Sequence, residues 1–141
     1  MERYGHQMSL PEIGTAGQEK LSAASVLVVG LGGLGSALSY CLAGMGVGKL
    51  TLMDPDRVSL SNLDRQILYT EADVGEFRAQ AAVRRLAAFN RHVRLRPLPR
   101  AFSDGGGEAA AGADLVLAAI DTLSSRLEIN ATLSNPQTMP T

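Results

Sequence analysis

Residues 25–35 read SVLVVGLGGLG, an apolar run that passes directly into a glycine-rich turn. The run predicts a buried strand, because uninterrupted valine and leucine are typical of the inner strands of parallel sheets. In the turn, Gly30 and Gly32 permit a close approach of backbone N–H groups to a phosphate, and Gly35 lets the next helix pack against the strand. The stretch therefore predicts a nucleotide-binding turn with a helix N-terminus facing an anion.

An acidic residue ends the next apolar segment. Asp54 follows residues 49–53 (KLTLM) and lies roughly 20 residues beyond the turn, the spacing at which a carboxylate can accept hydrogen bonds from both ribose hydroxyls. We also expect the nearby Asp56 to contact the nucleotide. The turn and the carboxylate together indicate an adenine nucleotide, but they do not distinguish ATP from NAD.

The polar segment after Asp54 favours ATP. Residues 54–66 read DPDRVSLSNLDRQ, whereas a dinucleotide dehydrogenase would usually pass quickly into its next helix. We expect the segment to bring Asn62, Arg65 and Gln66 close to the phosphate turn, where an arginine fork can neutralise charge that develops during attack on phosphorus. Nucleotidyl transfer requires such neutralisation of charge at phosphorus, whereas hydride transfer does not. The sequence contains no Walker-type phosphate loop.

Helical and strand patterns alternate along the chain. Right-handed crossovers between such elements predict an α/β, doubly wound, mainly parallel sheet of strand order 3-2-1-4 with flanking helices. In this order Asp121, at the end of the fourth strand, faces the glycine turn and can hold Mg²⁺ there, with helix capping as the alternative role. The expected strands are residues 25–29, 49–54, 93–98 and 114–120, and the expected helices are 9–22, 33–45 and 76–90.

Length and composition fit one globular domain. The 141 residues carry a net charge of −1, which gives no bulk attraction to nucleic acid or to an anionic membrane. The N-terminus lacks a secretion signal and no apolar run reaches the length of a membrane span, so we expect a cytoplasmic protein. We divide the chain into a helical segment (1–24), a Rossmann-like ATP-binding domain (25–135) and a tail (136–141).

Three further features have ordinary structural interpretations. Cys41 is the only cysteine, which excludes an internal disulfide, and its apolar neighbours predict a buried thiol. The arginines between residues 78 and 100 are spread over a helix and a strand, which predicts a solvated face rather than a nucleic-acid surface. The glycines at 105–107 predict a flexible loop.

Motifs along nearly the whole chain resemble the ThiF/MoeB/HesA family, the bacterial relatives of ubiquitin-activating enzymes. The likeness runs from Arg3 to about Asn130, and the SNLDRQ segment together with the double-glycine turn is highly specific. The resemblance implies ATP- and Mg²⁺-dependent adenylation of the C-terminal glycine of a ubiquitin-like sulfur-carrier protein, as in thiamine or molybdopterin biosynthesis, by a homodimer. The motifs are RYGHQ (3–7), LPEIG (10–14), GQEKL (17–21), GLGGLG (30–35), AGMGVG (43–48), SNLDRQ (61–66) and Asp121 with Arg126.

The resemblance also implies roles for individual residues. It makes Arg65, Arg78 and Asp121 catalytic. Arg65 would stabilise the pentavalent phosphorus, Arg78 would stand in for a phosphate-binding lysine, and Asp121 would be the Mg²⁺ ligand. The nucleotide-binding residues that it implies are Gly30, Gly32, Gly33, Gly35, Asp54, Asp56, Asn62, Arg65, Gln66, Arg78 and Asp121.

The chain departs from the family pattern in several places. His6 stands where the resemblance expects an arginine that reaches into the partner subunit's site, and a neutral histidine cannot make a bidentate fork. Thr122 replaces an asparagine. The chain stops where a fifth strand would begin, so we expect the family's paired-cysteine zinc site and most of the carrier-protein groove to be absent. A truncated nucleotide-binding or dimerisation module without catalysis is therefore the alternative function, and an NAD-binding domain is the third.

Overall fold

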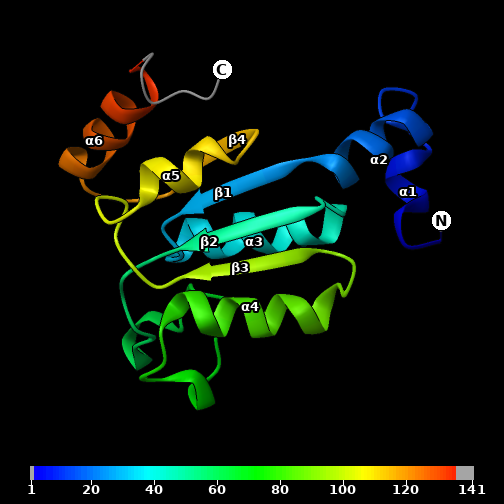
Figure 1. Ribbon diagram of the computed structural model, residues 1–141. Coiled ribbons are helices and arrows are strands. Elements are labelled where there is room, and N and C mark those ends of the chain that lie inside the picture. Colours follow the sequence, from blue (N-terminus) through cyan, green and yellow to red (C-terminus); the bar gives the residue numbers. More distant parts are fainter. Residues whose placement is uncertain (1, 136–141) are drawn as a thin grey trace.

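The computed structural model describes residues 2–135, and the predicted tail at 136–141 lies outside them. Four strands form one sheet: β1 (Ser25–Val29), β2 (Lys49–Met53), β3 (Arg94–Leu98) and β4 (Leu115–Ala118). Their order is β3-β2-β1-β4 and every neighbouring pair is parallel; Figure 1 shows β1, β2 and β3 running in the same direction. The predicted strand order is confirmed.

Helices cover both faces of the sheet, as a doubly wound fold requires (Figure 1). The helices α3 (Gly33–Met45) and α4 (Arg78–Phe89) pack on one face, and α5 (Gly106–Ala111) and α6 (Leu123–Leu133) pack on the other. The winding of the sheet therefore reverses between β1 and β4. The remaining elements are the 3-10 helices η1 (Glu2–Tyr4), η2 (Leu60–Asn62) and η3 (Glu71–Asp73) and the helices α1 (Gly5–Met8) and α2 (Gly14–Ala23).

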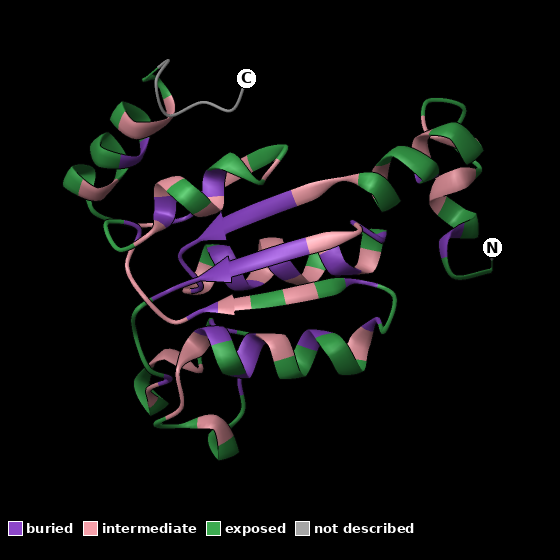
Figure 2. Cartoon of the chain, viewed as in Figure 1, coloured by how far each residue is buried: buried purple, intermediate pink, exposed green. Residues whose placement is uncertain are grey.

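Strand β1 supplies the centre of the core on both faces. Val26 and Val28 pack with α3 and α4, while Leu27 and Val29 pack with α5 and α6. This alternation follows from the two-residue period of a strand, and burial on both sides explains why the sequence reads as a continuous apolar run. Figure 2 shows most of β1 and β2 in purple, as buried residues.

Helix α3 packs on the sheet through small residues. Its buried positions are Gly35, Ser36, Ser39 and Ala43, which share one face because they recur at helical spacing. Cys41 lies outside that face and is exposed, so the predicted buried thiol is wrong. The prediction failed because α3 lies so close to the sheet that only small side chains fit on its buried face. The larger apolar residues around Cys41 therefore do not lie on that face.

The N-terminal segment differs from the single helix predicted at 9–22. Two helices, α1 and α2, are separated by turns at residues 9–13, and Gly14 takes a left-handed φ of 55° where α2 begins. The segment docks at the end of α3, where Gln7 Nε2 donates a hydrogen bond to the carbonyl oxygen of Met45 (2.8 Å). Figure 1 shows α1 and α2 at the amino ends of the strands, far from the turn between β1 and α3.

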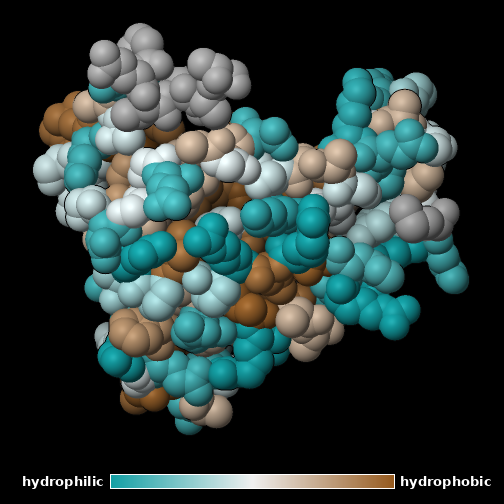
Figure 3. Space-filling view, viewed as in Figure 1, coloured by the Kyte–Doolittle hydropathy of each residue, from teal (hydrophilic) through white to brown (hydrophobic). Residues whose placement is uncertain are grey.

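Two predictions for the C-terminal third need correction. The glycines at 105–107 begin helix α5 rather than forming a flexible loop, because Gly105 takes a left-handed φ of 89° that redirects the chain into the helix. Strand β4 is shorter than predicted and forms an edge of the sheet, where Leu115 is 50% exposed. Exposed leucines also occur in α6, at Leu123 and Leu127, and Figure 3 shows hydrophobic atoms over that helix, at the left of the view.

The arginine-rich stretch of α4 and β3 is largely solvated, as predicted. Arg85, Arg94 and Arg96 are exposed, whereas Arg78 and Arg100 are partly buried. Among the helices of residues 2–135, none has the length and the apolar character needed to cross a membrane.

The variant Gly35→Ala tests the contact that sets α3 against β1. A Cβ at this position would overlap the carbonyl oxygen of Gly30, so the helix must shift, and we expect the free energy of unfolding to fall by about 3 kcal/mol or more. The control is Gly33→Ala in the same helix. Its Cβ would meet a side-chain carbon of Arg65 at an ordinary 3.5 Å and should change stability by less than about 1 kcal/mol. Urea unfolding followed by circular dichroism measures both, and equal stability of the two variants would refute the contact's importance.

Candidate nucleotide-binding site

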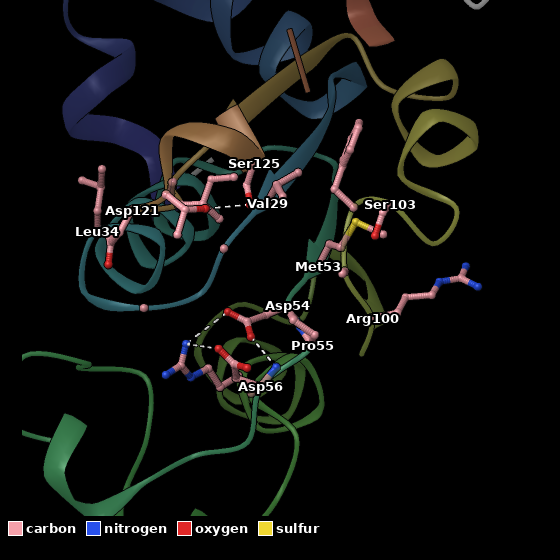
Figure 4. A pocket seen from close by; sticks show the side chains of 18 of the residues that line it. Val29, Leu34, Met53, Asp54, Pro55, Asp56, Arg100, Ser103, Asp121 and Ser125 are labelled. Atoms are coloured by element: carbon pink, nitrogen blue, oxygen red, sulfur yellow. Dashed lines mark hydrogen bonds and ion pairs between the residues drawn. The ribbon is translucent and has the colours of Figure 1, made fainter. Parts of the chain in front are cut away.

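A cleft of about 330 Å³ opens at the carboxyl ends of β1, β2 and β4. It lies where the winding of the sheet reverses, which is the point at which open parallel sheets bind their ligands. Figure 4 shows Asp54 and Asp56 on one side of the cleft and Asp121 on the other. Of the residues predicted from the sequence, the cleft is lined by Gly30, Gly32, Gly33, Asp54, Asp56, Arg78 and Asp121.

The glycine turn forms one wall of the cleft. Gly30 has a φ of 96°, and a Cβ there would lie 2.5 Å from the carbonyl oxygen of Ala119, so a larger residue does not fit. Gly32 is the N-terminal cap of the 13-residue helix α3, and Gly33 begins it. Free N–H groups of the first turn therefore face the cleft, an arrangement that binds phosphate. Gly35 lies behind the turn and does not line the cleft.

Asp54 anchors the turn. Its side chain is 4% exposed, its Oδ2 accepts a hydrogen bond from the Leu31 N–H (2.8 Å), and its Oδ1 accepts one from the Asp56 N–H (2.7 Å). Arg78 is a third donor, at 3.3 Å from Oδ2. Because a carboxylate offers about four acceptor positions, one remains in the free chain for a ribose hydroxyl.

Arg78 brings a positive charge to the cleft. Its Nη1 lies 3.3 Å from Asp54 Oδ2 and 3.5 Å from Asp56 Oδ2, contacts drawn as dashed lines in Figure 4. The side chain is 13% exposed, and its buried Nε has no hydrogen-bond partner within residues 2–135. Two carboxylates therefore neutralise Arg78 in the free chain, and a phosphate that enters the cleft would compete with them.

The SNLDRQ segment lies beside the glycine turn. Side-chain carbons of Arg65 come within 3.6 Å of the Cβ position of Gly33, and its exposed guanidinium donates to Asn62 Oδ1 (3.4 Å). Gln66 is buried, with Nε2 3.8 Å from the Cβ position of Gly32. Arg65 and Gln66 are thus close to the turn and Asn62 contacts Arg65, but none of the three predicted residues lines the cleft itself.

Asp121 lies across the cleft from Asp54 and is exposed. The N-terminal cap position of α6 belongs to Thr122, whose Oγ1 donates to Ser125 Oγ (2.7 Å). Asp121 therefore precedes the cap position of α6, and its carboxylate lines the cleft. Among residues 2–135 no group of three or more acidic, histidine or cysteine side chains could hold a metal ion. A single carboxylate suits Mg²⁺, which keeps water and phosphate ligands.

Two parts of the cleft wall were not predicted from the sequence. They are the loop after β3, from Arg100 to Ser103, and the start of α6, with Ser125 and Glu128. Figure 4 shows the Arg100 side chain directed away from Asp54. The predicted strand order was a usable signal for the loop, because all loops that follow parallel strands meet at the same edge of the sheet. The position of α6 depends on how its side chains pack against the sheet, and no sequence pattern predicted that it would line the cleft.

Tyr69 is a further residue that the sequence did not single out. It is 6% exposed, and its Oη donates a hydrogen bond to the Leu31 carbonyl oxygen (2.7 Å), behind the glycine turn. Burial raises the pKa of the Tyr69 phenol above its ordinary value, so the hydroxyl stays protonated at neutral pH. Tyr69 follows the SNLDRQ segment closely, but only the folded chain brings it to the turn.

The fold and the cleft together define the class of protein. A parallel sheet wound in both directions, with a glycine turn and a helix N-terminus beside a cleft at its switch point, is the arrangement of a Rossmann-like α/β fold.

Comparisons with known proteins identify the family. The ThiF family matches residues 4–138, and the chain belongs to this family. It is 45% identical over 131 residues to the sulfur carrier protein adenylyltransferase of Thermus thermophilus and 46% identical over 132 residues to the molybdopterin-synthase adenylyltransferase of Salmonella typhimurium. These alignments cover 92% and 93% of this chain but 48% and 53% of the relatives, so the chain spans about half their length.

A solved structure with the same fold contains a nucleotide. The tRNA N6-threonylcarbamoyladenosine dehydratase TcdA of E. coli, in complex with ATP, matches with a TM-score of 0.79 at 29% identity. The match covers 86% of this chain and 50% of that one.

The variant Asp54→Asn keeps the shape of the side chain and removes its charge. The amide would place a donor opposite the Leu31 or Asp56 N–H and would leave Arg78 without its buried partner, so we expect the free energy of unfolding to fall by about 2–4 kcal/mol. The control, Asp56→Asn, changes a side chain that is 66% exposed and should cost less than about 1 kcal/mol. Urea denaturation gives both values. A loss at Asp54 no larger than the loss at Asp56 would contradict the anchoring role.

Proposed function

We propose that this chain is the ATP-binding portion of an adenylyltransferase that activates the C-terminus of a ubiquitin-like sulfur-carrier protein. The observation that carries the proposal is the convergence of a helix N-terminus, an arginine and carboxylates from two different strand ends on one cleft. The relatives named as sulfur carrier protein and molybdopterin-synthase adenylyltransferases support it, and so does the ATP held by a structural neighbour.

ATP is proposed to lie with its phosphates at the N-terminus of α3. The N–H groups of Gly32 and Gly33 are oriented for phosphate oxygens, and Arg78 can exchange its carboxylate partners for a phosphate. Asp54 would then receive one ribose hydroxyl at its open acceptor position and a second at the position that Arg78 vacates. This arrangement uses the cleft along its length, from the end of β2 to the end of β4.

The proposed reaction transfers AMP to the carrier protein. A carboxylate oxygen of the carrier's C-terminus forms a bond to the α-phosphorus, the bond from that phosphorus to the bridging oxygen breaks, and pyrophosphate leaves. Arg65 has an exposed guanidinium beside the turn, and we assign it the stabilisation of charge that develops on the phosphorus. Asn62 contacts this guanidinium and would hold a neighbouring phosphate oxygen, whereas the buried Gln66 would act beside Gly32.

Asp121 fits the role of a Mg²⁺ ligand. It contributes a hard oxygen on the wall opposite Asp54, and Mg²⁺ would complete its coordination with phosphate oxygens and water. When bound, the ion neutralises phosphate charge. Arg78 and Asp121 would thus act from opposite sides of the cleft.

Pyrophosphate exchange tests this function. The chain is incubated with ATP, Mg²⁺, labelled pyrophosphate and one of a panel of small ubiquitin-like sulfur-carrier proteins. Label should enter ATP only when a carrier with an intact C-terminus is present, and the same carrier without its last residues is the control. ATP binding without exchange would favour the alternative of a nucleotide-binding module without catalysis. Tighter binding of NAD than of ATP would reject the proposal.

The variant Arg65→Ala should lower the turnover number of this exchange far more than it raises the KM for ATP. Loss of one preorganised donor to a transition state reduces the rate by about 10²–10³. The matched control is Arg85→Ala, because Arg85 is an exposed arginine on α4 outside the cleft. A variant of Arg65 whose defect appears only in KM would instead identify a residue that binds ground-state ATP.

We further propose that the chain associates with itself through the β4 edge. Within residues 2–135, β4 pairs only with β1, and exposed leucines lie on β4 and on α6. An unpaired apolar edge favours pairing with another chain.

Light scattering at high micromolar concentration should therefore show a dimer or a larger species. Leu115→Lys places a charge on the β4 edge, where the leucine is 50% exposed, and should shift the population toward the monomer. Leu10→Lys is the control, because Leu10 is similarly exposed at 52% but lies in the N-terminal segment. A monodisperse wild-type monomer would refute the association. If only the Leu10 variant shifted the population toward the monomer, the interface would lie in the N-terminal segment and not at the β4 edge.

A further inference from the structure

The peptide between Leu31 and Gly32 is held from behind by two hydroxyl groups. The Leu31 carbonyl oxygen accepts hydrogen bonds from Tyr69 Oη (2.7 Å) and Ser36 Oγ (3.1 Å). Both of its lone pairs are therefore used. Leu31, Ser36 and Tyr69 are all buried, so these two hydroxyls take the place that water would have at an exposed turn.

This arrangement determines where the Gly32 N–H points. Cis peptide bonds are absent from residues 2–135, and in a trans peptide the C=O and N–H groups point in opposite directions. A carbonyl held behind the turn therefore directs the next N–H toward the cleft, which Gly32 lines. In the described part of the chain this N–H donates to no acceptor. It is available to a ligand.

The peptide that precedes Leu31 is fixed as well. Its N–H donates to Asp54 Oδ2 (2.8 Å). One side of Leu31 is therefore held through its N–H and the other through its carbonyl oxygen. The turn has few ways to reorganise, so the Gly32 N–H is oriented before any ligand arrives.

We propose that Tyr69 is a positioning residue for ATP, which orients the Leu31–Gly32 peptide so that the Gly32 N–H meets a phosphate oxygen. The proposal rests on the ATP-binding function proposed above. Without the Tyr69 hydroxyl, Ser36 remains as the one donor to the Leu31 carbonyl. The peptide can then rotate, and in part of the population the Gly32 N–H no longer faces the phosphate.

Tyr69→Phe separates this role from packing, because phenylalanine fills the same space and lacks the donor. The variant is titrated by calorimetry with ATP and with adenosine, at a temperature where it is folded. We expect its affinity for ATP to fall about five- to tenfold, as for the loss of one buried hydrogen bond. Its affinity for adenosine, which has no phosphate, should not change.

Tyr40→Phe is the matched control. Tyr40 lies further along α3, where its ring stacks on Phe89 at 4.3 Å, and it does not line the cleft. Its variant should keep both affinities. Unchanged ATP affinity in Tyr69→Phe would overturn the proposal. Equal losses for ATP and adenosine, or the same loss in the Tyr40 variant, would also overturn it, because each would indicate a general structural effect.

A second measurement does not depend on ATP. In amide NMR spectra of the free chain, Tyr69→Phe should shift or broaden the Gly32 signal, whereas Tyr40→Phe should leave it in place. If the wild-type chain bound no ATP, the proposed function would fail, but this signal would still decide whether Tyr69 orients the peptide. An unchanged Gly32 signal in Tyr69→Phe would overturn the positioning role by itself.

Discussion

The absence of a side chain at Gly35 determines how the molecule is built around its cleft. The carbonyl oxygen of Gly30 occupies the space that a Cβ at this position would need, so α3 begins directly on the end of β1. This close approach buries Leu31 and directs the N-terminus of α3 into the cleft. The small residues on the buried face of α3 continue the same contact along the helix. Asp54 and Tyr69 hold the same turn through the Leu31 N–H and the Leu31 carbonyl oxygen.

Features that depend on repeating patterns could be predicted from the sequence. The strand order followed from apolar runs and from the handedness of crossovers, which do not depend on the details of side-chain packing. The bounds of α3, Gly33–Met45, were predicted to the residue, because the glycine turn fixes its start and Gly46, with a left-handed φ of 83°, ends it. The same signals indicated that Asp54 and Asp121 follow strand ends at one edge of the sheet, and both line the cleft found there.

Features that depend on contacts between distant segments could not be predicted. Arg78 pairs with Asp54 across 24 positions of the sequence, and Tyr69 meets Leu31 across 38. No local pattern encodes such pairings, because the donors that reach a carboxylate or a carbonyl depend on how the intervening loops close. The exposure of Cys41 has a similar origin, since the distance between α3 and the sheet decides which face of the helix is buried.

The docking of the N-terminal segment limits what His6 can do. Its neighbour Gln7 is bound to Met45, at the end of α3 that points away from the cleft. A helix of 13 residues is about 20 Å long, so roughly the length of α3 separates His6 from the cleft of its own chain. A step that brings His6 to a bound nucleotide must therefore join two copies of the chain. At low protein concentration, the rate of such a step would rise with the square of that concentration.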